Sequence, residues 1–219
     1  MQIINACGPR PAYCSGPRRG AKIKFIVIHY TGVPGAHGAS MARRFARSEL
    51  PGNARKSSAH YVVDGERVWQ AIPDARCAWH VGDGQPSWSY RECGGYDHAV
   101  EWHRKLAAGG LNFAGNRESI GIELCCTLTN PRDKGRVEDT SWAFTKGTQT
   151  TALALCVELC RKYELSADRV IRHYDATGKP CPRPFVSLPG DGNGANDAAW
   201  AVFQLLLEKR LAGECHERE

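Results

Sequence analysis

An imidazole, an ammonium and a thiol lie close together in the segment from Arg172 to Pro182, which reads RHYDATGKPCP. They belong to His173, Lys179 and Cys181, and a glycine and two prolines suggest that a loop carries them. A third possible ligand, His29, follows the apolar run FIVI. Two histidines and one cysteine can bind zinc and leave a fourth position for water, which is the arrangement of catalytic zinc sites. The pattern predicts a zinc hydrolase.

Apolar strands alternating with amphipathic helices are expected to position these side chains. Strand patterns cover residues 22–30, 58–64, 67–71, 119–127 and 169–173, and helix patterns cover residues 39–50, 148–163 and 197–211. The second and third strands should form a hairpin, and the continuous apolar run of the first indicates burial on both faces. This order predicts an α/β fold, with a central mixed β-sheet flanked by helices.

The chain of 219 residues is long enough for one domain with a full hydrophobic core. We expect one catalytic domain over residues 1–219, made of an N-terminal arm (1–21), a core (22–186) and a C-terminal helix and tail (187–219). The arm is rich in Gly, Pro and Arg, which predicts little regular structure. No repeat or low-complexity linker indicates an attached binding domain.

The formal net charge of +6, with well-mixed signs, favours approach to an anionic polymer such as a cell wall but does not by itself indicate nucleic acid. No signal peptide and no membrane-spanning run is visible, so we expect a protein made in the cytoplasm, without membrane insertion. We also expect a monomer. Reduced thiols are then favoured for the ten cysteines. Pairing of Cys7 with Cys14, or of Cys77 with Cys93, outside the cell stays open.

Five motifs occur in the order of one protein family. They are VIHYT at 27–31, SAHYVV at 58–63, AWHVG at 78–82, SIGIEL at 119–124 and the segment 173–181. In these motifs the chain resembles the type-2 N-acetylmuramoyl-L-alanine amidases, which include phage endolysins and are related to peptidoglycan-recognition proteins. The resemblance covers about residues 22–186 and implies the zinc-dependent amidase fold.

The resemblance also implies a reaction and a metal. Zinc would be bound by His29, His173 and Cys181, and the substrate would be the amide that joins N-acetylmuramic acid to L-alanine in bacterial peptidoglycan. A phage or prophage endolysin released by a holin is the expected setting, with a cell-wall recycling enzyme as the alternative. Some family members use a tyrosine where this chain has Ala59, whereas others use a glutamate, which here is Glu123.

Two residues are the predicted catalytic groups. Glu123 should act as the base, because a carboxylate in an apolar strand is hard to explain by packing. The alternative is an outward-facing residue paired with an arginine. Lys179 could stabilise the oxyanion of the tetrahedral intermediate, and the alternative is a solvated loop lysine.

A further set of side chains is predicted to contact substrate. Two alternatives stay open for His80, which are contact with a zinc ligand from the side away from the metal, or a packing role. For His60 the alternatives are the same contact with a zinc ligand, or a place in the core. His98 and His103 do not share a helical face well, which argues against a second metal site there. The substrate-contacting set is His80, Trp79, Tyr30 and His60.

The stretch 83–118 is longer than in compact relatives, and its role is open. Trp88 and Trp102 in this stretch could face sugar rings or anchor the insertion to the domain. Two other functions compete with the amidase: a non-catalytic peptidoglycan-binding module, and a zinc hydrolase of another amide.

Overall fold

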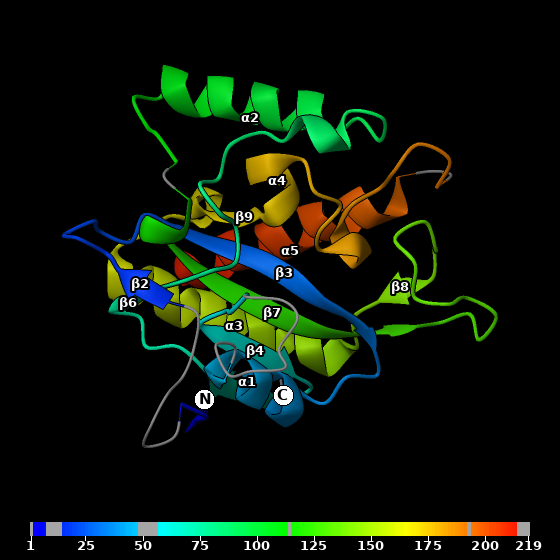
Figure 1. Cartoon of the computed structure of the whole chain (residues 1–219), viewed down its shortest axis with the longest axis horizontal. Helices are drawn as coiled ribbons and strands as arrows, with labels where there is room; N and C mark the ends of the chain where they lie inside the picture. Colours follow the sequence, from blue (N-terminus) through cyan, green and yellow to red (C-terminus); the bar gives the residue numbers. More distant parts are fainter. Residues whose placement is uncertain (1, 8–14, 48–56, 114, 192–193, 214–219) are drawn as a thin grey trace.

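A central mixed sheet organises the computed structural model, which describes residues 2–7, 15–47, 57–113, 115–191 and 194–213 (Figure 1). Neighbouring strands are parallel except for the β4–β5 hairpin and the short β8, which pairs with the end of β7. In spatial order the strands are β1 (Ile3–Asn5), β5 (Arg67–Gln70), β4 (Tyr61–Asp64), β7 (Ser119–Leu128), β3 (Phe25–Pro34) and β9 (Val170–Arg172), with β8 at Trp142–Ala143. The predicted central mixed sheet is confirmed.

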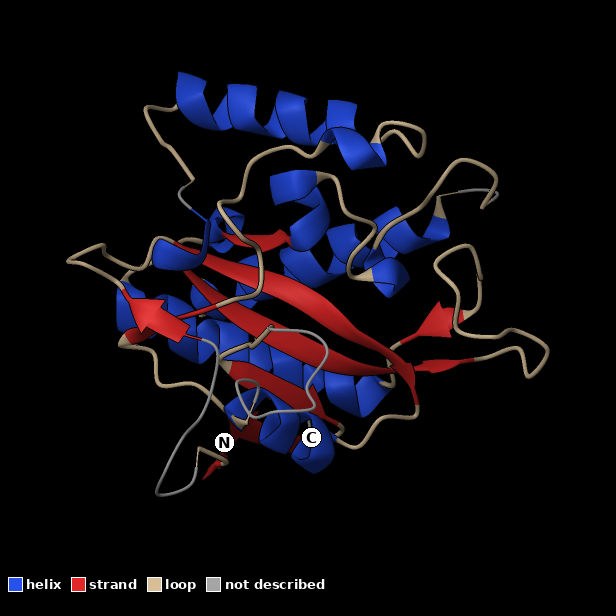
Figure 2. Cartoon of the chain, viewed as in Figure 1, coloured by secondary structure: helices blue, strands red, loops and turns tan. Residues whose placement is uncertain are grey.

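Helices cover both faces of this sheet (Figure 2). One face packs on α3 (Lys146–Tyr163) and α5 (Ala195–Leu211) through the largest apolar cluster. The other face is covered at one side by α1 (Gly38–Ala46) and at the other by α2 (Gly95–Ala108), with α4 (His173–Thr177) beside it. The prediction of flanking helices is therefore also confirmed.

Short elements complete the chain. The strands β2 (Ser15–Pro17) and β6 (Arg76–Ala78) form a separate antiparallel pair. Single 3-10 turns lie at η1 (Trp88–Tyr90), η2 (Gly115–Arg117), η3 (Ala167–Arg169) and η4 (Arg183–Phe185). No helix in the described part of the chain is long and apolar enough to cross a bilayer.

Strand alternation decides which residues face the functional side. On β3, Ile26 and Ile28 enter the cluster under α3 and α5, so His29 points to the opposite face. On β7, Ile122 enters the same cluster, which places Glu123 on the face of His29. His29 and Glu123 are register partners across this parallel pair, so the fold puts them side by side.

The prediction of little regular structure in residues 1–21 is wrong for the described part of this arm. Residues 3–5 pair in parallel with β5, and residues 15–17 pair with β6. Pairing satisfies backbone groups of β5 that would otherwise form an open sheet edge. Arg18 then anchors the arm, because its guanidinium is buried and donates to the carbonyl oxygens of Asp74 and Ser119.

Several predicted boundaries also differ: the first strand covers Phe25–Pro34 instead of 22–30, and the hairpin begins at Tyr61 instead of 58. The strand predicted to end at His173 ends at Arg172, and the segment predicted as a loop begins with α4. Asp175 causes this early turn, since its carboxylate accepts from the backbone N–H of Arg172 at 2.7 Å, before the first helical residue. The helix predicted at 39–50 runs over Gly38–Ala46 and ends with Arg47 in a turn, and its predicted end at 48–50 lies outside the described residues.

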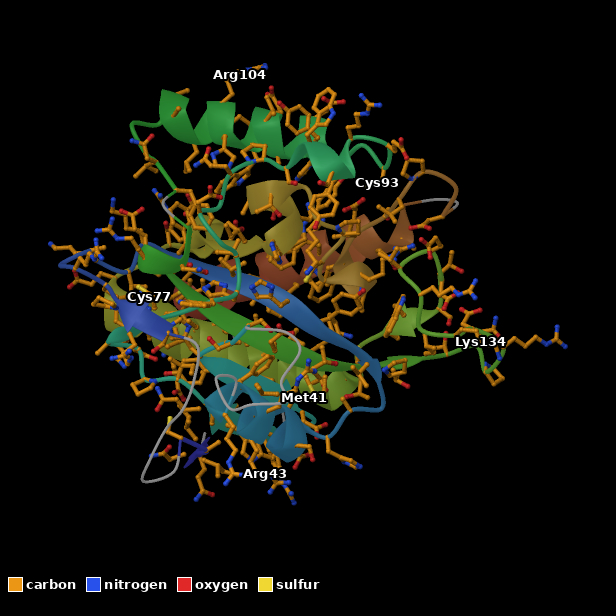
Figure 3. All side chains as sticks on the ribbon, in the orientation of Figure 1. Met41, Arg43, Cys77, Cys93, Arg104 and Lys134 are labelled. Carbon is orange, nitrogen blue, oxygen red and sulfur yellow. The ribbon has the colours of Figure 1, made fainter. Side chains whose placement is uncertain are left out.

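The cysteines of the proposed pair lie far apart. Figure 3 labels Cys77 on β6 and Cys93 next to α2, at separate sites in the molecule. Both are free thiols, so no Cys77–Cys93 disulfide is formed, whereas the alternative pair of Cys7 with Cys14 involves a residue outside the described part of the chain.

Candidate metal centre and cleft

Three predicted ligands meet where β3 and β9 lie side by side. Ile28 is the register partner of Arg172, so His29 on β3 lies beside His173, the first residue of α4. Cys181 returns to the same point after α4. The three side chains are buried, and their candidate ligand atoms all lie within 4.8 Å of one another.

The distances suit a zinc ion. Nδ1 of His29 lies 3.1 Å from Nδ1 of His173 and 3.7 Å from Sγ of Cys181. A tetrahedral zinc ion with usual bond lengths needs ligand atoms about 3.3 to 3.6 Å apart. Within the described residues, no other group of three His, Cys, Asp or Glu side chains converges in this way.

Burial also sets the protonation of these ligands. It lowers the pKa of His29 and of His173 well below the ordinary value, with Lys179 adding to the effect, so both imidazoles are neutral and keep a free lone pair. Burial raises the pKa of Cys181 to about 12, which Lys179 opposes. Such a thiol ionises when a cation binds beside it, so the group is chemically suited to a metal.

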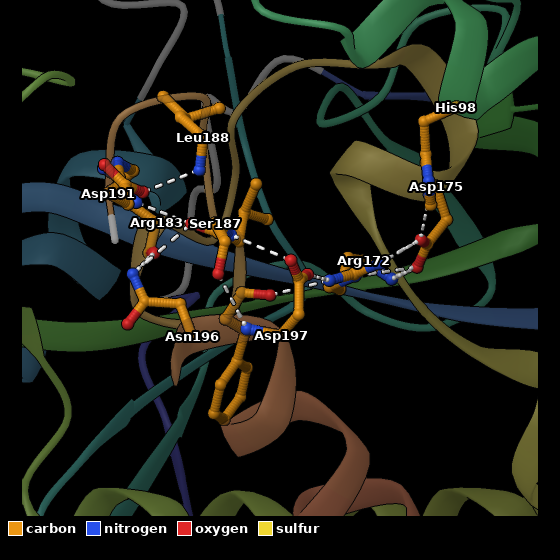
Figure 4. Close-up of polar contacts among 11 residues, drawn as sticks. His98, Arg172, Asp175, Arg183, Ser187, Leu188, Asp191, Asn196 and Asp197 are labelled. Atoms are coloured by element: carbon orange, nitrogen blue, oxygen red, sulfur yellow. Dashed lines mark hydrogen bonds and ion pairs between the residues drawn. The ribbon is translucent and has the colours of Figure 1, made fainter. Parts of the chain in front are cut away.

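A buried arginine holds the start of α4, directly before His173. The Arg172 guanidinium donates to Asp175 at 2.8 Å, to Asp197 at 2.6 Å and to the carbonyl oxygen of Phe185 at 2.7 Å (Figure 4). These bonds tie the end of β9 to α5 and to η4. The orientation of His173 therefore depends on contacts from the C-terminal part of the chain.

A second buried arginine, Arg183, lies two residues after Cys181. It holds the segment that carries this ligand. Arg183 is fully buried and donates to Asp191 at 2.7 Å and to the carbonyl oxygens of Val137 and Val186 (Figure 4). Neither arginine is among the residues predicted to build the site. The available signal was a cation inside an otherwise apolar stretch, which has to find partners when it is buried.

The metal centre opens into a cavity of about 850 Å³. His29 and Cys181 lie at its wall, and so do Glu123 and Lys179. The structure therefore brings both predicted catalytic residues to the predicted ligands.

Glu123 is half-buried, and its Oε2 atom is buried without a hydrogen-bond partner among the described residues. It forms no ion pair within that part of the chain, contrary to the alternative of a surface pair with an arginine. Burial raises the pKa of Glu123 to about 8, and the charges of Lys179 and Arg44 oppose this rise. An unpartnered carboxylate with a near-neutral pKa is suited to general base catalysis.

Lys179 is exposed and reaches the cavity from a loop that α2 supports. Gly178 adopts φ +83°, and a Cβ atom at this position would lie 2.4 Å from the backbone of Gly95. Ser87 also donates its backbone N–H to the carbonyl oxygen of Thr177 at 2.9 Å. The insertion 83–118 thus packs directly on the loop that carries Lys179.

Three members of the predicted substrate-contacting set, His80, Trp79 and Tyr30, line the cavity. His60 does not, because it is fully buried, accepts from the backbone N–H of Gly121 at 2.9 Å and contacts the carbonyl oxygen of Arg76 at 3.0 Å. The structure favours the core alternative for His60.

The insertion histidines have structural partners. Nε2 of His98 lies 2.8 Å from Oδ1 of Asp175, and Nε2 of His103 lies 2.9 Å from the carbonyl oxygen of Ala176. Both side chains therefore contact α4, although their spacing predicts that they do not share a helical face well. Trp102 packs edge-on against Phe25 and anchors the insertion, as one alternative predicted.

A comparison with known protein families identifies the family of this chain. The family described as N-acetylmuramoyl-L-alanine amidase matches residues 19–184, which include all three candidate ligands and both candidate catalytic residues. The chain belongs to this family. The resemblance found in the sequence motifs is confirmed.

Individual amidases agree with this assignment. A probable N-acetylmuramoyl-L-alanine amidase of Bacillus licheniformis is 31% identical over 78% of this chain and 39% of its own length. The amidase BlyA of Bacillus subtilis (strain 168) is 33% identical over 88% of this chain and 43% of its own length. The chain thus spans between about two fifths and about half of the length of the curated relatives it matches. A solved mutant endolysin from Bacillus subtilis shares the fold, with a TM-score of 0.57 over 94% of this chain and 99% of its own, at 24% identity.

Proposed function

We propose that this amidase-family chain hydrolyses the amide between N-acetylmuramic acid and L-alanine in bacterial peptidoglycan, using one zinc ion held by His29, His173 and Cys181. The observation that carries the proposal is the convergence of these three ligands at the wall of a cavity that also presents Glu123 and Lys179. The names of the amidases that this chain resembles support the choice of bond.

When bound, zinc would polarise the amide carbonyl and lower the pKa of a water molecule toward about 7. The protein supplies the proton transfers. Glu123 takes the proton of the attacking water on its carboxylate and then gives it to the leaving amine of L-alanine.

Lys179 supplies the second charge. Its ammonium, which faces the cavity from the loop after α4, stabilises the oxyanion that develops on the former amide carbonyl. The close packing of Gly178 on Gly95 keeps this loop in place, which favours a preorganised donor.

The remaining parts of the proposal concern substrate and setting. Trp79 and Tyr30 contact the glycan or stem peptide in the cavity, and the net charge of +6 favours approach to an anionic wall. The chain acts as one catalytic unit, because the sheet combines strands from residue 3 to residue 172, and it acts as a monomer. It acts as a phage or prophage endolysin, after synthesis in the cytoplasm and holin-mediated release.

Digestion of purified cell walls tests this function. New L-alanine amino groups without new reducing sugars are expected, and a chelator should abolish their release. Release of a different amine would identify another amide as the substrate. Wall binding without any new amine would support the non-catalytic module, which the intact ligand set and the unpartnered Glu123 disfavour.

A further inference from the structure

His80 lies directly behind the ligand His29. Its Nδ1 atom is 3.0 Å from Nε2 of His29, which is the ring nitrogen that faces away from the other two ligands. On its far side, Nε2 of His80 is 3.1 Å from the hydroxyl oxygen of Ser119. These three side chains form one hydrogen-bonded row, which we name the His29–His80–Ser119 row.

The direction of every hydrogen bond in this row follows from its far end. The Ser119 hydroxyl is 2.7 Å from the carbonyl oxygen of Gly115, which can only accept, so the hydroxyl donates its one proton there. Its oxygen must then accept from Nε2–H of His80. That leaves Nδ1 of His80 bare, and it accepts from Nε2–H of His29.

The last step reaches the metal centre. With its proton on Nε2, His29 has a bare Nδ1, and this is the atom that lies 3.1 Å from Nδ1 of His173 and 3.7 Å from Sγ of Cys181. We infer that Ser119 and His80 are positioning residues that fix the ring and tautomer of His29 so that its Nδ1 lone pair faces the metal. This inference rests on the zinc site of the proposed function, but not on the substrate.

The surrounding backbone is built to hold His80. A Cβ atom at Gly121 would lie 2.6 Å from Cγ of His80, so a glycine is needed there for the ring to fit. The side-chain oxygen of Asn116 accepts from the backbone N–H groups of His80 and Val81, at 3.0 and 2.9 Å. Ser119 is fully buried, which protects the far end of the row from water.

Zinc affinity measured by competition with a chelating dye tests the row. In His80→Phe the ring keeps its shape but loses both nitrogens, and we expect zinc to bind about 10- to 100-fold more weakly than to the wild type. His80→Asn should recover much of this loss, because its amide oxygen can take the place of Nδ1 as the acceptor. Unchanged affinity in His80→Phe would overturn the inference.

Two further variants separate positioning from general loosening. His103→Phe removes a histidine that bonds to a backbone carbonyl and lies outside the row, so it should bind zinc like the wild type. Equal losses in His103→Phe and His80→Phe would contradict the inference. Ser119→Ala keeps the ring of His80 and should weaken zinc binding several-fold, which provides a test even if His80→Phe does not fold.

The tautomer itself can be observed by ¹H–¹⁵N correlation of the imidazoles in the zinc-loaded chain. The row requires a proton on Nε2 of His80 and none on its Nδ1, and Ser119→Ala should make this preference weaker. A proton on Nδ1 of wild-type His80 would overturn the inference while leaving the zinc site in place. Failure of the wild type to bind zinc at all would instead remove the metal of the proposed function, and the inference with it.

Discussion

Two pairs of histidines meet at α4, and they differ in what their ring nitrogens face. His29 and His173 point nitrogen atoms at each other and at a thiol, so their lone pairs converge on one point. His98 and His103, on α2, each face an oxygen atom of α4. In Figure 1, α4 lies between α2 and β3, the strand that carries His29. Converging lone pairs indicate a metal site, whereas an oxygen partner for each ring indicates a structural role, so we call His98 and His103 the scaffold pair.

The largest effect should come from removing the Cys181 thiol, which lies beside the converging pair of histidines. Cys181→Ala leaves two neutral imidazoles, which cannot complete a three-ligand zinc site. We expect strongly reduced zinc content and loss of nearly all amidase activity, measured by metal analysis and by amine release from cell walls. Full zinc and full activity in this variant would remove Cys181 from the ligand set.

Glu123→Gln should fold and bind zinc but lose about 10²- to 10⁴-fold in kcat, because the amide cannot accept the proton of the attacking water. Single-turnover rates with zinc-saturated protein measure this loss. If turnover is nearly normal, the base lies elsewhere. Tyr61 is then a poor substitute, since its hydroxyl is buried and donates to Asp74 at 2.7 Å.

Lys179→Met should lower kcat by about 10²- to 10³-fold, equivalent to roughly 3 to 4 kcal/mol, with little change in zinc content or KM. Lys179→Arg should recover activity only in part, because a planar fork does not replace a compact charge. A raised KM with normal kcat would assign Lys179 to ground-state binding of a stem carboxylate.

Much of this site could be predicted from the sequence because its motifs are local. His29 follows a strand, and His173 and Cys181 share one short segment, so the ligand set needed no knowledge of distant contacts. The anchors of these ligands could not be found in this way. Arg172 and Arg183 depend on Asp197 and Asp191, which approach only once α5 packs on the sheet.

The same distinction explains the N-terminal arm and the insertion. The short strands at 3–5 and 15–17 form because β5 and β6 offer partners far along the chain, and composition does not show such partners. The contacts of His98 and His103 with α4 likewise depend on how α2 is placed, which helical spacing alone does not determine.

The pKa of Glu123 predicts a pH dependence of stability in the zinc-free chain. The pKa is raised from 4.5 to about 8 in the folded state, so the protonated carboxyl contributes its full stability below pH 4.5. This contribution is lost as the pH rises toward 8. Between these values the wild type should lose stability relative to Glu123→Gln, by a few kcal/mol at most, since one pKa unit corresponds to about 1.4 kcal/mol. Thermal unfolding of both chelator-treated proteins across this range measures the difference, and parallel curves would contradict the raised pKa.

The smallest effect is expected at the scaffold pair. His98→Phe removes the hydrogen bond to Asp175, but Asp175 keeps Arg172 as a buried partner, so the carboxylate is not left alone. We expect a loss of about 1 kcal/mol in the free energy of unfolding, with unchanged zinc content. Because α2 packs on the loop of Lys179, a small fall in kcat is expected, of no more than a few-fold. Tyr163→Phe loses a hydrogen bond to Asp74 away from the cavity and provides the matched control. Zinc loss in His98→Phe comparable to that in Cys181→Ala would mean that the two pairs of histidines are not separate in function. The hydrogen bonds of α2 to α4 would then be needed to hold the metal ligands themselves.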